Sequence, residues 1–321
     1  QVLQRIPLQG EDPRAMAVSP DGRRVYVAIF ESGNQTTIIG NGGFVPADFP
    51  YNVVGIPSGP HDGQNPPPNE GAAFQPAIGP ALPVPPSVPQ IVKHDGQGHW
   101  LDDNGGDWTR FVSGPQSLFT GRVPGWRMLD HDLAILDLDT ASVSYADDLM
   151  NLCMAVAVNP ATGRVSVIGT DGTNEVRFEP NLKGRFLRVE HAQVDPLAPA
   201  SPVRGDLNPH LDYAQASVAP ALRAQSLSDP RGIVWNAAGT RAYVTGLGTN
   251  NLIVIDAAGQ RAGLNPTISV GEAPTGIALD EARQRLYVLN KHDATISVVS
   301  TATELELTRV PFFDSTPAAI R

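Results

Sequence analysis

The stretch "RAYVTGLGTNNLIVID" at residues 241–256 decides the fold of this chain. Apolar and β-branched residues fill both of its ends, and the polar loop "GLGTNN" separates them, which is the pattern of two β-strands joined by a tight connection. Similar stretches occur at residues 286–300, "LYVLNKHDATISVVS", and at residues 25–39, "VYVAIFESGNQTTII". Because Tyr243 and Tyr287 hold equivalent positions 44 residues apart, the chain is predicted to repeat one β unit.

Four copies of the unit can be aligned, and each is predicted to contain four strands. The first and second strands lie within residues 14–30, 153–169, 231–247 and 275–291. The third strands are expected at 133–139, 175–180, 251–256 and 295–300, and the fourth at 141–147, 184–190, 266–271 and 305–312. Such units are typical of propeller blades. We therefore predict an all-β fold: a β-propeller of four-stranded antiparallel blades.

Four blades are recognisable, which is compatible with part of a larger seven-bladed ring. Residues 1–321 are predicted to form a single β-propeller domain or a fragment of one. The opening "QVLQRIPLQGEDPRA" is expected to supply a fourth strand of an incomplete blade, and the closing "STPAAIR" the start of another first strand.

Composition excludes several classes of function. The net charge is −10 and no basic run occurs, which excludes a nucleic-acid partner. The single cysteine, Cys153, lies in the apolar run "LCMAVAV" and is predicted to be a core residue. Because no CxxCH motif occurs, this chain holds no covalent c-type haem. No stretch approaches the ~20 apolar residues of a membrane span.

Two long insertions are expected at one end of the propeller. A Pro/Gly-rich insertion at 41–125 lies in blade one, and a second insertion at 191–228 lies between blades two and three. Because strand directions alternate, second-to-third loops and fourth-to-first links share one end, which we call the inserted face. Long loops on a rigid β scaffold often carry binding sites. All seven histidines map to this face: His61, His94, His99, His131, His191, His210 and His292. Loops are rich in polar residues in any case, so this clustering alone does not establish a binding site.

The repeat resembles the YVTN-type β-propeller family over roughly 200 residues. The matching segments are Val25-Tyr26-Val27, Ala242-Tyr243-Val244-Thr245 and Leu286-Tyr287-Val288, together with Pro20-Asp21-Gly22 and Val254-Ile255-Asp256. The resemblance is specific for the fold and not for a function, because propellers host binding proteins, lyases, lactonases and dehydrogenases.

Several residues on the inserted face are candidates for binding. Arg14 and Arg231 belong to two Asp-Pro-Arg motifs where a blade enters its innermost strand. They would bind an anion or a partner carboxylate, or else pair with an acid of the next blade. His131, His292 and Asp293 lie in equivalent loops and would supply a base or a metal ligand, or else be ordinary turn residues.

The segment "DDNGGDW" at 102–108 is a candidate calcium loop, because Asp102, Asp103, Asn104 and Asp107 offer oxygen ligands around two glycines. The EF-hand spacing is not met. Residues 103–108 also resemble the Asp-box turn of sialidase-like propellers, although Leu101 stands where that motif has serine. A structural turn is therefore the alternative interpretation.

The chain resembles large bacterial extracytoplasmic proteins in which a propeller adjoins c-type haem domains. The features that carry this resemblance are the blades and the segments "HWLDDNGGDWT" and "VPFFDSTPAAIR". This resemblance implies a periplasmic or extracellular, non-catalytic scaffold that docks a cytochrome c-like domain or another protein on the inserted face. One alternative is a metal-assisted lyase or lactonase. It requires at least three of six histidines to converge within ligand distance: His94, His99, His131, His191, His210 and His292. Another is a cell-surface adhesion module, which requires an exposed apolar patch on the insertions.

Overall fold

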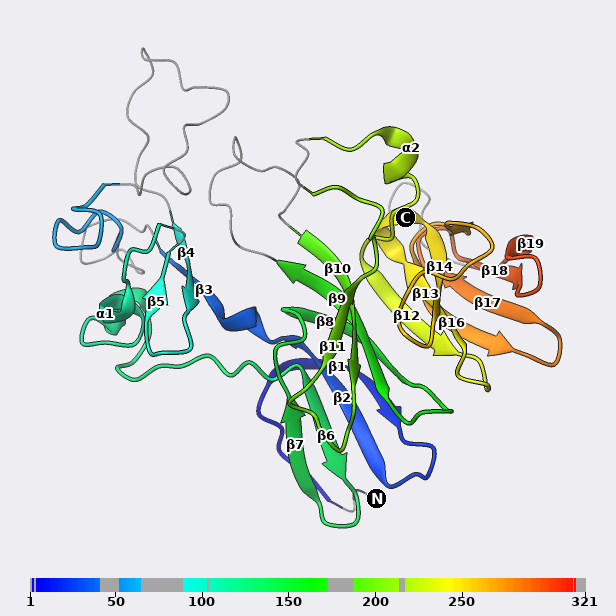
Figure 1. The fold of residues 1–321 in the computed structure, drawn as a ribbon, viewed down its shortest axis with the longest axis horizontal. Helices are drawn as coiled ribbons and strands as arrows, with labels where there is room; N and C mark the ends of the chain where they lie inside the picture. The colour runs from blue at the N-terminus through cyan, green and yellow to red at the C-terminus, as the bar shows by residue number, and fades with distance from the viewer. Residues whose placement is uncertain are drawn as a thin grey trace.

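The structure is a computed structural model that describes residues 2, 4–40, 52–64, 89–102, 104–172, 187–213, 217–313 and 315. Most of its regular secondary structure is β-strand (Figure 1). Its helical elements, within those ranges, are α1 (Thr109–Val112), α2 (Pro220–Arg223) and the 3-10 turns η1 (Gly33–Gln35), η3 (Ser117–Thr120) and η5 (Leu247–Thr249). No helix in those ranges has the length and apolarity that a membrane crossing requires.

Strand pairing confirms four blades of four antiparallel strands, and a single pair between β2 and β8, Glu31 with Leu152, joins the first two blades into one eight-stranded sheet. Blade one contains β1 (Glu11–Val18), β2 (Arg24–Glu31), β6 (Leu133–Asp137) and β7 (Ser142–Ala146). Blade two contains β8 (Leu152–Val158), β9 (Val165–Gly172), β10 (Leu187–Val194) and β11 (Val203–Asp206). Blade three contains β12 (Pro230–Trp235), β13 (Arg241–Gly246), β14 (Asn251–Asp256) and β15 (Ile268–Ser269). Blade four contains β16 (Pro274–Asp280), β17 (Arg285–Asn290), β18 (Thr295–Ser300) and β19 (Leu305–Pro311).

Blade two differs from its sequence prediction. Its expected third strand at 175–180 lies outside the described residues. Residues 187–190, which were expected in the fourth strand, belong to β10, and β10 pairs with β9 as the third strand. The expected insertion at 191–228 therefore begins too early, because its range includes the end of β10 and all of β11. The prediction assumed the same short connection between the second and third strands in every blade. In blade two, residues 173–186 separate β9 from β10.

Neighbouring blades share apolar cores. Tyr26 of blade one packs with residues of blade two, and Tyr243 of blade three packs with residues of blade four. In blade two the equivalent position is Ser166, and Trp235 of blade three lies against it, with its indole N–H donating to the Ser166 hydroxyl at 3.2 Å. A large side chain from the next blade thus fills the space that a tyrosine fills elsewhere, which preserves close packing.

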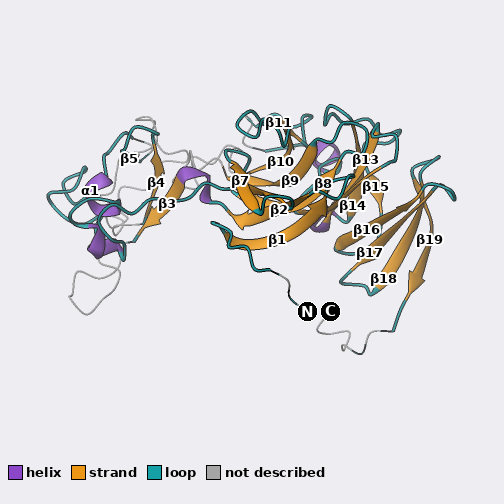
Figure 2. Cartoon of the chain, turned by 90° about the horizontal axis from the view of Figure 1, so that it is seen from below, coloured by secondary structure: helices purple, strands orange, loops and turns teal. Residues whose placement is uncertain are grey.

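Part of the first insertion folds around a core of its own. Strands β3 (Thr36–Ile39), β4 (Gln90–His94) and β5 (Trp100–Leu101) form a separate antiparallel sheet beside α1. We call residues 36–39, 52–64, 89–102 and 104–128 the inserted unit. Figures 1 and 2 show its strands at the end of the molecule opposite blade four. Its core consists of Ile39, Val53, Val54, Val92, Trp100, Trp108, Phe111 and Val112.

Candidate binding site beside the inserted unit

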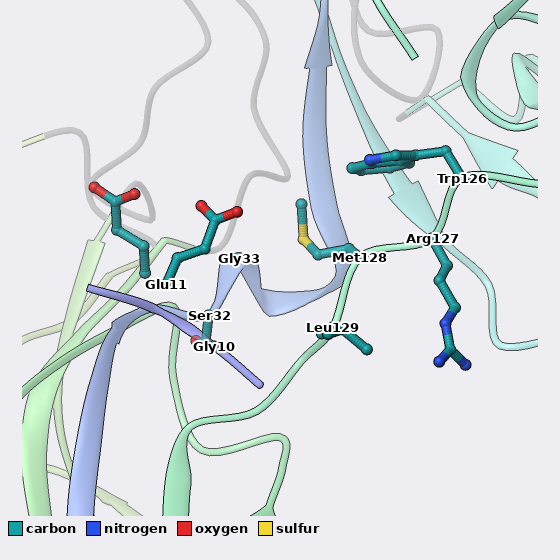
Figure 3. Close-up of a pocket in the computed structure, with 9 residues that line it drawn as sticks. Gly10, Glu11, Ser32, Gly33, Trp126, Arg127, Met128 and Leu129 are labelled. Atoms are coloured by element: carbon teal, nitrogen blue, oxygen red, sulfur yellow. The ribbon is translucent and has the colours of Figure 1, made fainter. Parts of the chain in front are cut away.

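A cavity of about 480 Å³ lies between blade one and the segment that leads from the inserted unit back to β6. Most of its lining belongs to the long connection between β2 and β6, so the cavity lies on the inserted face. Figure 3 shows Glu11 on one side of it and Trp126 and Met128 on the other. The lining residues are Gly10, Glu11, Glu31, Ser32, Gly33, Trp126, Arg127, Met128 and Leu129.

The acidic wall of the cavity consists of two glutamates held in register. Glu11 begins β1 and Glu31 ends β2, and the two are paired directly across the strands. Both are exposed, and neither forms an ion pair with the described part of the chain. Like charges directly opposite each other destabilise a sheet. A bound cation between them would relieve that repulsion.

The apolar wall is fixed by the core of the inserted unit. Trp126 packs at 5.4 Å from Trp100, and the guanidinium of Arg122 lies 4.8 Å from the Trp126 ring centre. Met128 lies directly against Gly33, where a Cβ would collide with the methionine sulfur. Gly33 also has a φ of 82°, which favours glycine. The cavity therefore combines two exposed carboxylates with a half-buried aromatic and thioether surface.

A neighbouring hollow of about 310 Å³ extends the site along the inserted face. It shares Glu31 and Gly33 with the first cavity and reaches Ile38 and Leu152. Ile38 is 60% exposed. Together the two hollows can hold an extended chain segment that places a Lys or Arg near the glutamates, since such side chains combine a cationic head with an apolar stem.

The two predicted arginines pair within their own motifs. Arg14 lies 2.7 Å from Asp12 and stacks over the Phe30 ring at 3.6 Å. Arg231 lies 2.8 Å from Asp229. Among the residues that the structure describes, neither arginine pairs with an acid of the next blade. Both aspartates have a left-handed φ of about 50° and precede a proline at the entrance to an innermost strand, so the repeated motif shapes that entrance.

The predicted loop residues have local partners. Nδ1 of His131 lies 2.8 Å from Asp147, and its ring stacks on Tyr145 at 4.0 Å. Asp293 accepts a hydrogen bond from the Thr295 hydroxyl at 2.8 Å and one from the Glu272 amide at 3.2 Å. The backbone N–H of His292 donates to the Glu272 carbonyl. Within the described ranges, no group of three or more His, Cys, Asp or Glu side chains is placed to hold a metal.

The predicted calcium residues form a turn organised by Asp102. Its carboxylate accepts hydrogen bonds from the Trp108 indole at 2.8 Å and from the Asn104 and Gly106 amides at 2.8 and 2.9 Å. Nε2 of His61 lies 2.6 Å from it. Burial opposes ionisation, but the hydrogen bonds outweigh burial and hold the pKa of Asp102 below its ordinary value.

The other predicted calcium ligands do not join Asp102 around a common point in the described residues. Asp107 accepts the Thr109 amide at 2.8 Å, and Asp103 lies outside the described residues. Asn104 contributes its backbone N–H to Asp102. Because the oxygens of Asp102 already face donors of the chain, this geometry favours the structural-turn alternative.

Sequence reasoning missed the glutamates of the cavity and two buried ionisable groups. Burial raises the pKa of Asp132 to about 7, and the Leu149 amide donates to it at 2.7 Å. Burial lowers the pKa of His191 to about 4. His191 was expected in a surface insertion, but it lies in β10 and is buried. The apolar alternation through "HAQV" at 191–194 was the available signal for a strand there.

The fold and the cavity define the class of the chain as a β-propeller module with a separately cored insertion. No protein-family model and no curated protein matches it. Solved structures similar to it include a streptogramin B lyase (14% identity, 60% of this chain, 52% of that chain, TM-score 0.38). A second is the nidogen/laminin complex (12% identity, 93% of this chain, 79% of that chain, TM-score 0.41). A third is hydrazine synthase of Kuenenia stuttgartiensis (13% identity, 91% of this chain, 84% of that chain, TM-score 0.44). The match spans about half of the lyase. Likenesses at this level carry no inference about activity.

Proposed function

We propose that the chain is a non-catalytic propeller module that binds a cationic segment of a protein partner on its inserted face. The observation that carries this proposal is the cavity that the paired Glu11 and Glu31 line together with Trp126 and Met128. A Lys or Arg of the partner would place its charge between the carboxylates and its stem on the apolar wall. The net charge of −10 also favours approach of a basic partner.

The partner that the sequence resemblance favours is a cytochrome c-like domain of a larger secreted or periplasmic protein. In that arrangement the propeller orients the haem domain and takes no part in the chemistry. A surface-adhesion role is the second candidate, because Ile38, Leu118 and Val123 expose apolar side chains on the inserted unit. The metal-assisted enzyme gains no support, because the described histidines do not converge.

The test is a titration of the chain with a basic c-type cytochrome at low ionic strength, followed by quenching of tryptophan fluorescence. Saturable quenching that weakens as salt is added is expected. Glu31→Lys should weaken binding at least about tenfold. Glu272→Lys is the matched control, because it makes the same charge change at an exposed site outside the cavity, in the link between β15 and β16.

A parallel titration with a lysine-rich peptide separates the site from the identity of the partner. Peptide binding that depends on Glu31, without cytochrome binding, would refute the haem-domain partner and leave the cationic site in place. Equal losses in Glu31→Lys and Glu272→Lys would refute the cavity as the binding site.

A further inference from the structure

One side of blade four is an apolar surface that no other part of the described chain covers. Its residues form two rows across the paired strands β16 to β19. The first row consists of Ala278, Tyr287, Val298 and Thr308, which are paired across neighbouring strands, and the second consists of Leu289, Ile296 and Val310. Tyr287 is 37% exposed, Leu289 40% and Val310 49%. We call these seven residues the outer side of blade four.

The opposite side of the same blade is buried. Leu286, Val288 and Val299 are fully buried in a core shared with blade three. Strand residues alternate between the two sides of a sheet, so the exposure of Tyr287 and Leu289 follows from their position and not from disorder at the strand ends. Figure 2 shows blade four as the last blade of the row, with β16 to β19 at one end of the molecule.

The 44-residue repeat identifies what this kind of surface packs against. Tyr287, Ile296 and Val298 correspond to Tyr243, Leu252 and Val254 of blade three. All three of those equivalents are buried, at 4%, 0% and 2% exposure, by the aliphatic side of blade four. Tyr26 of blade one holds the same position and is 1% exposed against blade two. In blades one and three this position is thus covered by the following blade.

We propose that the outer side of blade four is the docking surface for a further four-stranded blade of the same repeat type. The occupant would present aliphatic residues where blade four presents Leu286, Val288 and Val299 to blade three. A second copy of the chain fits less well, because the corresponding side of its blade one is already packed against Leu8. The Gln9 amide also donates to the Tyr145 hydroxyl there at 2.7 Å.

The test supplies such a blade to the intact chain. A copy of residues 270–313 is fused after Arg321 through a flexible Gly/Ser linker, which gives the copy a millimolar effective concentration. The tyrosine of the appended copy is replaced by Phe, so that hydroxyl-radical labelling and mass spectrometry report only on the parent Tyr287. Labelling of Tyr287 should fall several-fold, to the level of Tyr243, and Tm should rise by on the order of 5 °C.

Matched controls separate blade docking from other effects. An appended copy carrying Val288→Lys should give neither protection nor a rise in Tm. Unchanged labelling of Tyr287 in the original fusion would overturn the proposal. If the unfused chain sediments as a dimer that Tyr287→Glu abolishes and Leu197→Glu does not, the occupant is a second copy and the proposed blade is wrong. The cytochrome titration uses a different surface, so the two proposals fail independently.

Discussion

Replacing Asp102 by Asn should unfold the inserted unit at denaturant concentrations that leave the blades intact. The side chain of Asp102 is fully buried and meets four donors: the Trp108 indole, His61, and the amides of Asn104 and Gly106. Asn keeps one oxygen for the two amides, but its NH2 group then faces the indole and the imidazole. Two contacts to a charged acceptor are lost together.

The magnitude follows from those contacts. A buried donor left without a partner costs about 1–3 kcal/mol, and hydrogen bonds to a charged group contribute about 1.5–3 kcal/mol each. We therefore expect Asp102→Asn to lower the free energy of unfolding of the inserted unit by about 3 kcal/mol. The pKa of Asp102 lies below its ordinary 3.8 in the fold. Its contribution is therefore present above about pH 4 and is lost as the pH falls through the lowered pKa.

The distribution of tryptophan makes the assay specific. Trp100, Trp108 and Trp126 all belong to the inserted unit, and the fourth tryptophan, Trp235, is in blade three. In a Trp235→Phe background, fluorescence reports the inserted unit and far-UV circular dichroism reports mainly the blades. Urea unfolding of Asp102→Asn should shift the fluorescence transition and leave the circular dichroism transition nearly unchanged.

The matched control is Asp107→Asn, which changes an exposed carboxylate that accepts a single amide. It should cost less than about 1 kcal/mol. A fluorescence shift for Asp102→Asn no larger than that of the control would refute the role of Asp102 as the centre of the turn. Restoration of the Asp102→Asn defect by added calcium would instead favour the calcium loop.

Two buried groups should give opposite pH dependences, each visible in urea midpoints measured from pH 4.5 to 8. Burial lowers the pKa of His191 from 6.5 to about 4 in the fold. The stability that accompanies its neutral form is therefore complete above pH 6.5 and is lost as the pH falls toward 4. His191→Gln should remove that loss. The pKa of Asp132 rises from 3.8 to about 7, so its contribution is complete below about pH 4 and is lost as the pH rises through 7. Asp132→Asn should therefore raise stability at pH 8 by about 1–2 kcal/mol, and a decrease there would show that Asp132 is stabilised as a carboxylate.

The repeat made the blades predictable because each strand of a blade has a recurring apolar pattern. Tyr243 and Tyr287 alone set the period, and the strands of blades three and four follow it. The period failed in blade two, where the third strand, β10, begins at Leu187 and not at the expected residue 175. Loop length is not encoded in the packing of the blade, so the repeat carries no information about it.

The candidate site was harder to predict than the blades. Glu11 and Glu31 become a pair only through the register of β1 and β2, which the sequence does not display. Trp126 reaches the cavity only because the inserted unit has its own core. The composition of the acidic loop at 102–108 predicted a metal site. In the structure its central carboxylate, Asp102, contacts His61, which is 41 residues away in sequence.

We propose that the cavity beside the inserted unit binds a cationic protein segment. Hydrogen–deuterium exchange of the chain, with and without the basic c-type cytochrome, tests it most directly. We expect protection at residues 10–12, 31–33 and 126–129, which is lost in Glu31→Lys and kept in Glu272→Lys. Protection confined to the hairpin turns at 19–23 and 236–240, on the opposite end of the blades, would contradict it.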